Sequence, residues 1–144
     1  MIEKINMYNY TRQSGKTSNL KLKAITASRM LYDVVLIITH NRDMSDDIRV
    51  WFNDLKYADM ITYNCHNHIK VVCANEVIDY IRGREFNSVL VLMDEPFKVE
   101  LDKQIEMMDL FETSRTCYHI VGFGTDRTPK LFKDFIVNGS TNVK

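Results

Sequence analysis

The sequence predicts an α/β fold in which a mainly parallel, doubly wound β-sheet is covered by helices on both faces. Continuous β-branched and apolar runs at residues 34–38 and 89–93 indicate strands that are buried on both faces, as in parallel sheets. Segments with helical spacing alternate with strand-like segments along the chain. Parallel strands are joined by crossover connections, so this alternation favours helices packed on either side of one sheet.

The N-terminal part of the chain contains two strand–helix units. Residues 2–10 lack helical spacing and predict a first strand that runs into a Ser/Gly turn. Residues 16–30 carry apolar side chains at roughly helical spacing and predict the first helix. After the strand at 34–38, the acidic helix start at residues 45–47 and the apolar spacing that follows predict a second helix, which ends near Tyr57.

The remainder of the chain continues the alternation. The strongest strand pattern in the sequence ends on an acidic pair, and Gly83 stops the short helix that precedes it. The predicted elements are short strands or a hairpin at 60–63 and 69–73, a short helix at 76–82, a strand at 89–93, a helix at 101–111, a strand at 118–121 and a last helix at 130–137.

The length and composition bound the class of protein. The 144 residues fit one domain, which we assign to residues 1–138, followed by a polar C-terminal tail at 139–144. Nineteen basic and nineteen acidic residues give zero net charge, so any DNA contact must come from a local patch. Three cysteines without paired spacing do not indicate a disulfide framework. No apolar run approaches the roughly 20 residues that span a bilayer, and we expect a soluble, cytoplasmic protein without a membrane partner.

A phosphate-binding loop is predicted at residues 10–17, which match the pattern G-x-x-x-x-G-K-[S/T] except that Tyr10 replaces the first glycine. In this pattern, backbone N–H groups surround the phosphates, the lysine neutralises β- and γ-phosphate oxygens, and the hydroxyl binds magnesium. A Gly-Lys-Thr triplet also occurs in ordinary surface turns, but here a predicted strand precedes it, a helix follows it, and the loop has no acidic residue. We therefore expect ATP to bind here, with Mg²⁺ on Thr17. The predicted nucleotide-binding residues are Arg12, Gln13, Ser14, Gly15, Lys16, Thr17 and Ser18.

The acidic pair Asp94 and Glu95 directly follows the strongest predicted strand. Ligands of open α/β sheets bind at the carboxyl ends of the strands, so chemistry is expected at this position. Asp94 fits the role of a Mg²⁺ ligand, often through water, and Glu95 fits that of the residue that activates the attacking water. If Asp94 and Glu95 are considered without the Gly-Lys-Thr loop, the alternative interpretation is a solvated acidic turn at the end of a strand.

These motifs resemble those of the large terminase subunit, the motor that packages DNA in tailed phages, and of the related helicases. Residues 12–17 look like the arginine-containing loop of terminases, in which the first glycine is commonly absent. Residues 74–86 are similar to the segment with an Arg-Gly turn that introduces the acidic strand, and residues 122–125 are similar to the coupling motif. The three ordered matches cover roughly residues 10–126.

The resemblance implies a P-loop NTPase with a RecA-like (ASCE) core that hydrolyses ATP with Mg²⁺ and couples hydrolysis to work on double-stranded DNA. It implies catalytic roles for Glu95, Lys16 and Arg12, the last as an arginine finger that stabilises transition-state charge. It also implies that Gly124 and Thr125 sense the γ-phosphate and couple its loss to movement. If the protein is viral, its location is the host cytoplasm.

The sequence also offers candidates for a nucleic-acid contact and an expectation about assembly. Arg82 and Arg84 are the candidates for DNA contact, and a solvated helix face is the alternative. Relative to terminases, we expect this chain to lack the nuclease domain. A homo-oligomer or a partner protein would then complete the active site.

Two other functions remain open on the sequence. One is a regulatory module that binds nucleotide without turnover, and the other is a small nucleotide kinase, although no lid segment is evident. The residues Cys65, His66, His68 and Cys73 match no common zinc-ligand spacing, and an exposed loop with two histidines is the preferred interpretation.

Overall fold

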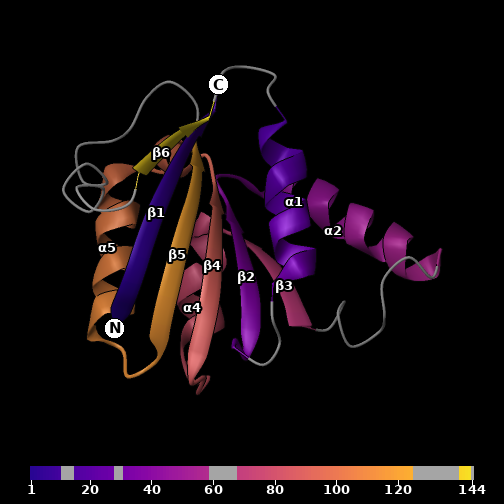
Figure 1. The fold of residues 1–144 in the computed structure, drawn as a ribbon. Coiled ribbons are helices and arrows are strands. Elements are labelled where there is room, and N and C mark those ends of the chain that lie inside the picture. The colour runs from indigo at the N-terminus through magenta and orange to yellow at the C-terminus, as the bar shows by residue number, and fades with distance from the viewer. Residues whose placement is uncertain (11–14, 28–30, 59–67, 125–139, 144) are drawn as a thin grey trace.

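The computed structural model describes residues 1–10, 15–27, 31–58, 68–124 and 140–143. Strands and helices alternate along these residues, which confirms the predicted α/β class (Figure 1). No helix in these ranges has the length and apolar character needed to cross a membrane. The elements are β1 (Ile2–Tyr10), α1 (Lys16–Thr26), β2 (Val34–Thr39), α2 (Arg42–Tyr57), β3 (Ile69–Cys73), a 3-10 turn (Ala74–Glu76), α4 (Val77–Ile81), β4 (Ser88–Asp94), a second 3-10 turn (Pro96–Lys98), α5 (Leu101–Thr113), β5 (Cys117–Gly124) and β6 (Ser140–Val143).

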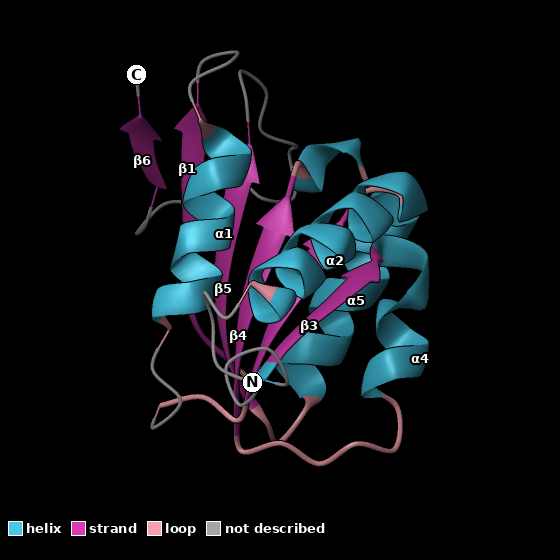
Figure 2. Cartoon of the chain, turned by 90° about the vertical axis from the view of Figure 1, so that its right-hand side faces the viewer, coloured by secondary structure: helices cyan, strands magenta, loops and turns pink. Residues whose placement is uncertain are grey.

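The described strands form one sheet in the order β3-β2-β4-β5-β1-β6, and every neighbouring pair is parallel. From β1 the chain moves to β2 and then to β3, whereas from β3 it moves back to β4 and β5. Crossovers between parallel strands are right-handed, so moves in opposite directions place their helices on opposite faces. Accordingly, α1 and α2 pack on one face of the sheet, and α4 and α5 pack on the other (Figures 1 and 2).

The apolar run of strand β2 contributes side chains to the hydrophobic clusters on both faces of the sheet. All six of its residues are buried. Val34, Leu36 and Ile38 pack in the cluster on the α4 and α5 side, whereas Val35 and Ile37 pack in the cluster on the α1 and α2 side. Successive side chains of a strand point to opposite faces, so a strand covered on both faces needs a continuous apolar run. The burial predicted for this run is confirmed.

Two helix boundaries differ from the prediction. Helix α1 ends at Thr26 instead of near residue 30, because the backbone of the next residue is extended. Helix α2 begins at Arg42, three residues before the predicted start at Ser45. The reason is a cap: the side-chain oxygen of Asn41 accepts a hydrogen bond of 2.9 Å from the backbone N–H of Met44. The acidic residues that we took as the start therefore lie within the first turns of the helix.

One edge of the sheet also corrects the sequence analysis. Residues 140–143, part of the predicted polar tail at 139–144, form β6 and pair in parallel with β1. Strand pairing uses backbone groups, so a polar composition does not prevent it at a sheet edge. Strand β3 pairs in parallel with β2, and the hairpin that we considered would join it to residues 60–63. The strand expected at 60–63 and the helix expected at 130–137 lie outside the described residues.

Gly122 in β5 leaves room for the side chain of Met7 in the neighbouring strand β1. A Cβ atom at this position would lie 2.5 Å from Cε and 2.6 Å from Sδ of Met7, a fully buried neighbour paired with Gly122 in register. We expect Gly122→Ala to lower the free energy of unfolding by about 1–3 kcal/mol, measured by urea denaturation. In a Met7→Ala background the colliding side chain is absent, and the same substitution should cost less. An equal loss in both backgrounds would contradict this explanation.

Candidate functional site

Residues from three elements meet at the carboxyl edge of the sheet. Asp94 is the last residue of β4, and His40 directly follows β2, the strand beside β4. Lys16 is the first residue of α1. The strands are parallel, so their carboxyl ends lie along one edge, and residues that are distant in the sequence become neighbours there.

The ammonium group of Lys16 contacts both members of the acidic pair. Its Nζ atom lies 2.5 Å from Oδ1 of Asp94 and 3.0 Å from Oε1 of Glu95. The exposed fraction of the side chain is 14% for Lys16, 0% for Asp94 and 7% for Glu95. Carboxylates this deeply buried need a nearby cation, and Lys16 supplies that positive charge. The structure thus brings together the loop lysine and the acidic pair that sequence analysis singled out, although Lys16 and Asp94 are separated by 78 residues.

The backbone of Glu95 explains how two successive carboxylates reach one ammonium group. In an extended strand, successive side chains point to opposite faces. Glu95 instead has φ 48° and ψ 58°, in the left-handed region that non-glycine residues rarely adopt. Its N–H donates a hydrogen bond of 2.9 Å to the carbonyl oxygen of Phe123 in β5, which holds this turn against the sheet. Strained backbone of this kind concentrates at functional sites.

Gly15 sets the direction of the chain immediately before Lys16. It caps α1 with φ 82° and ψ 24°, and its carbonyl oxygen accepts the first helical hydrogen bond, from the N–H of Asn19 at 2.9 Å. A Cβ atom at Gly15 would meet nothing within 4 Å, so the cost of a side chain comes from the backbone conformation alone. That cost is about 1–2 kcal/mol for an L-residue.

We expect Gly15→Ala to lower both the free energy of unfolding and the affinity for ATP, because relaxation of the backbone displaces Lys16. The matched control is Gly83→Ala, since Gly83 also has a positive φ, 76°, and free space around its Cβ position. Gly83 follows α4 and is remote from Lys16. Denaturation should show similar losses in both variants, whereas calorimetry should show weaker ATP binding for Gly15→Ala only. Equal ATP affinities would contradict a role for this turn in the site.

His40 is a third polar group at this edge, and sequence analysis missed it. Its Nδ1 atom lies 3.9 Å from Oδ2 of Asp94, which is too long for a hydrogen bond. Both atoms are buried, and among the described residues neither has a hydrogen-bond partner. Burial lowers the pKa of His40, although the charge of Asp94 opposes this, so the imidazole is neutral at pH 7. The signal that pointed to Asp94, a polar residue directly after a buried strand, also applies to His40.

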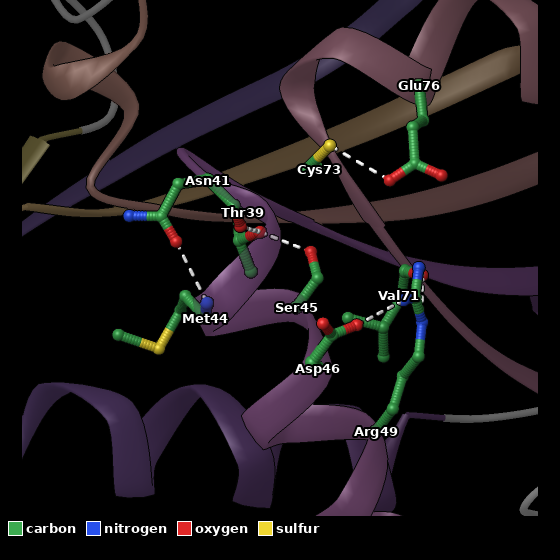
Figure 3. Close-up of polar contacts among 9 residues, drawn as sticks. All are labelled: Thr39, Asn41, Met44, Ser45, Asp46, Arg49, Val71, Cys73 and Glu76. Carbon is green, nitrogen blue, oxygen red and sulfur yellow. Dashed lines mark hydrogen bonds and ion pairs between the residues drawn. The ribbon is translucent and has the colours of Figure 1, made fainter.

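Hydrogen bonds anchor the residues on both sides of His40, and Figure 3 shows the contacts of Thr39 with Ser45 and of Asn41 with Met44. The hydroxyl of Thr39 donates to the carbonyl oxygen of Asn41 at 2.7 Å, and Thr39 Oγ1 lies 2.5 Å from Oγ of Ser45. The side chains of Thr39 and Ser45 are fully buried. Asn41 is held in turn as the cap of α2. Because the residues on both sides of His40 are anchored, its ring has a defined place beside the acidic pair.

The remaining predicted site residues are only partly described. Thr17 and Ser18 follow Lys16 in the first turn of α1, and Gly124 is buried at the end of β5. Residues that lie outside the described part of the chain are Arg12, Gln13, Ser14 and Thr125, together with Cys65 and His66 of the zinc alternative.

Arg82 and Arg84 lie away from the nucleotide-binding candidates. They follow α4 and precede the N-terminal end of β4, whereas Asp94 is at its carboxyl end. Arg82 is 3.9 Å from the carboxylate of Asp79, and Arg84 donates to the carbonyl oxygen of Tyr80 at 2.6 Å and lies over its ring. Both arginines are exposed. Any DNA contact that they make would therefore use a different surface from the one that contains Lys16.

Asp94 has the chemistry of a residue that could hold a magnesium ion. Within the described ranges, no group of three or more His, Cys, Asp or Glu residues is arranged to bind a metal, so the protein does not form a closed cage there. Asp94 nevertheless has a buried carboxylate oxygen without a hydrogen-bond partner among the described residues. Mg²⁺ at nucleotide sites takes one or two protein oxygens, phosphate oxygens and several waters. Asp94 and Thr17 are the residues that would hold it.

Comparisons with known proteins do not assign the chain to a family, because no protein-family model and no curated protein matches it. The fold and the site define an α/β protein with a parallel sheet whose carboxyl edge gathers Lys16, Asp94 and Glu95. Its function therefore has to be argued from that geometry.

Proposed function

We propose that the protein binds ATP together with Mg²⁺ and hydrolyses it at the site formed by Lys16, Asp94 and Glu95. The observation that carries this proposal is the contact of one ammonium group, at the N-terminus of a helix, with two successive buried carboxylates at the carboxyl edge of the sheet. The N-terminus of a helix favours phosphate, since its free N–H groups and its dipole attract anions. A lysine and two carboxylates provide the charges that phosphoryl transfer with a metal requires.

The ion pairs indicate how the site would change when nucleotide binds. Without nucleotide, Lys16 compensates the charge of both carboxylates. A triphosphate on the loop competes for this ammonium group, and transfer of Lys16 to the phosphate oxygens breaks its contacts with Asp94 and Glu95. Asp94 and Thr17 can then hold Mg²⁺, which neutralises charge on the β- and γ-phosphate oxygens. Glu95 can then orient the attacking water and accept its proton.

The strand order supports the finer proposal of a P-loop NTPase with a RecA-like core, related to terminases and helicases. Strand β5 lies between β1, which leads into the loop, and β4, which ends on the acidic pair. The end of β5 at Gly124 therefore emerges between the two halves of the site. A segment at residues 122–125 is well placed to respond to the γ-phosphate and to pass its loss to an element that moves double-stranded DNA.

A nucleotide-binding regulatory module with little turnover is the second candidate. The same ion pairs favour it, because a site that kept Glu95 on Lys16 after ATP binding would leave the attacking water without its base. Such a protein would act on the motor to which it binds.

Phosphate release from Mg-ATP distinguishes the two functions. We would measure it for the wild type and for Glu95→Gln, with and without double-stranded DNA, over a series of protein concentrations. Turnover that is stimulated by DNA, rises faster than linearly with protein and is lost in Glu95→Gln supports a DNA motor that assembles. Stoichiometric ATP binding with negligible phosphate release in every condition supports the regulatory module and contradicts hydrolysis.

A further inference from the structure

His40 and Asp94 approach each other at the carboxyl edge of the sheet without a hydrogen bond between them. The two facing atoms, Nδ1 of His40 and Oδ2 of Asp94, are 3.9 Å apart, buried and without hydrogen-bond partners in the described part of the chain. Buried polar atoms in proteins are almost always hydrogen-bonded, to protein groups or to bound water. Two such atoms that face each other indicate that one ligand is shared between them.

The distance between Nδ1 of His40 and Oδ2 of Asp94 limits the size of that ligand. At 3.9 Å the two atoms are too far apart for a direct hydrogen bond and too close to hold a chain of two waters. A single water, at the usual distance of about 2.8 Å from each atom, closes the gap as the third corner of a triangle.

The hydrogen-bonding groups of Asp94 and His40 indicate whether the shared molecule donates or accepts hydrogen bonds. The other carboxylate oxygen of Asp94, Oδ1, contacts the ammonium of Lys16 at 2.5 Å and becomes available to the cation when that ammonium moves to the phosphates. Oδ2 can only accept a hydrogen bond, and a neutral imidazole with its proton on Nε2 also accepts at Nδ1. With this tautomer of His40, the shared molecule donates one O–H to each residue, which leaves its oxygen lone pairs facing away from both. A water bound to a metal has this arrangement, because its lone pair is on the cation and both of its protons are available.

We propose that His40 is a positioning residue that, together with Asp94, holds one water of the Mg²⁺ shell at the nucleotide site. This inference rests on the proposed function, since the cation arrives with ATP. It assigns a role to the residue that follows β2, which the anchored turn between Thr39 and Asn41 places at the edge of the site. Partners that orient metal ligands in this way commonly change metal affinity about 10- to 100-fold when they are removed.

Three substitutions of His40 separate the effect of its Nδ1 atom from that of the imidazole ring as a whole. His40→Asn keeps an acceptor the same number of bonds from Cα as Nδ1, and His40→Gln moves the acceptor one bond further, to the position of Nε2. His40→Leu has a similar shape without any polar atom. Thermal denaturation establishes that each variant is folded. Replacement of an unpaired buried polar group by an apolar one of similar shape is close to neutral for stability, so His40→Leu is expected to fold.

The measurement is ATP affinity by calorimetry, first in EDTA and then over a titration with MgCl₂. For His40→Leu and His40→Gln, we expect the MgCl₂ concentration that gives half of the affinity gain to rise roughly 10-fold or more, with the affinity in EDTA unchanged. His40→Asn should need about the same MgCl₂ concentration as the wild type.

Each contrary result has a distinct meaning. An unchanged MgCl₂ requirement in His40→Leu overturns the proposal while the proposed function stands. Equal behaviour of His40→Asn and His40→Gln overturns the assignment of the contact to Nδ1. A loss of ATP affinity in EDTA as large as that in MgCl₂ shows that His40 shapes the site without acting on the metal shell, and this also overturns the proposal. A wild type whose ATP affinity does not respond to MgCl₂ overturns both the inference and the proposed function.

Discussion

Replacement of Lys16 by alanine is expected to remove tight ATP binding and to destabilise the fold at the same time. The ammonium group makes charge-assisted contacts with phosphate, and its loss should lower ATP affinity by about 100-fold. The same substitution leaves the fully buried Asp94 without its cation. Removal of one partner of a buried ion pair typically costs about 3–5 kcal/mol of stability. Calorimetry measures the first effect and urea denaturation the second.

A double variant separates these two effects. In Lys16→Ala/Asp94→Asn the buried carboxylate becomes a neutral amide of nearly the same shape, so most of the lost stability should return. ATP binding should remain weak, because the phosphate ligand is still absent. A double variant as unstable as Lys16→Ala alone would contradict the view that Lys16 stabilises the fold by compensating the charge of Asp94.

Glu95→Gln is expected to retain ATP binding and to lose hydrolysis. The amide has the shape of the carboxylate but cannot accept the proton of the attacking water, and loss of a general base typically lowers kcat about 10²- to 10⁴-fold. ATP affinity should stay the same or rise slightly, since Lys16 loses one of its two carboxylate partners and is freer to bind phosphate. Phosphate release and calorimetry measure the two quantities.

The matched control for this substitution is Glu76→Gln. Glu76 also lies near the carboxyl edge of the sheet, in the turn after β3, but its carboxylate contacts the thiol of Cys73 and not Lys16 (Figure 3). This variant loses the same charge and should hydrolyse ATP at the wild-type rate. Turnover by Glu95→Gln equal to that of the control would reject Glu95 as the base.

The parts of the fold that sequence predicted well are those fixed by local patterns. Strands β2 and β4 are buried on both faces, and such strands need a continuous apolar run, which is visible in one sequence. Gly83 has a positive φ and was recognisable as the end of a short helix. The capped start of α2 was harder, because Asn41 lies before the acidic residues that attracted the prediction. Strand β6 was missed because residues 140–143 carry no apolar pattern, and the backbone groups that pair strands are not visible in a sequence.

In the candidate site, too, some features were predictable from local sequence patterns and others were not. Lys16, Asp94 and Glu95 were recognisable because each stands at a strand–helix or strand–turn junction with a characteristic local spacing. The contact of Lys16 with both carboxylates was not predictable, since it depends on the left-handed backbone of Glu95. The proximity of His40 to Asp94 depends on β2 and β4 being neighbours. Strand order arises from how the crossovers pack, and spacing along the chain does not encode it.

The central claim is that the edge of the sheet with Lys16, Asp94 and Glu95 binds a nucleoside triphosphate with magnesium. Calorimetric titration of the wild-type protein with ATP, in MgCl₂ and in EDTA, tests it most directly, with the folded Lys16→Ala/Asp94→Asn variant beside it. We predict saturable binding of one ATP per chain that MgCl₂ strengthens and that the double variant loses. Absence of binding by the wild type at millimolar ATP, or equal binding by the double variant, would contradict the claim.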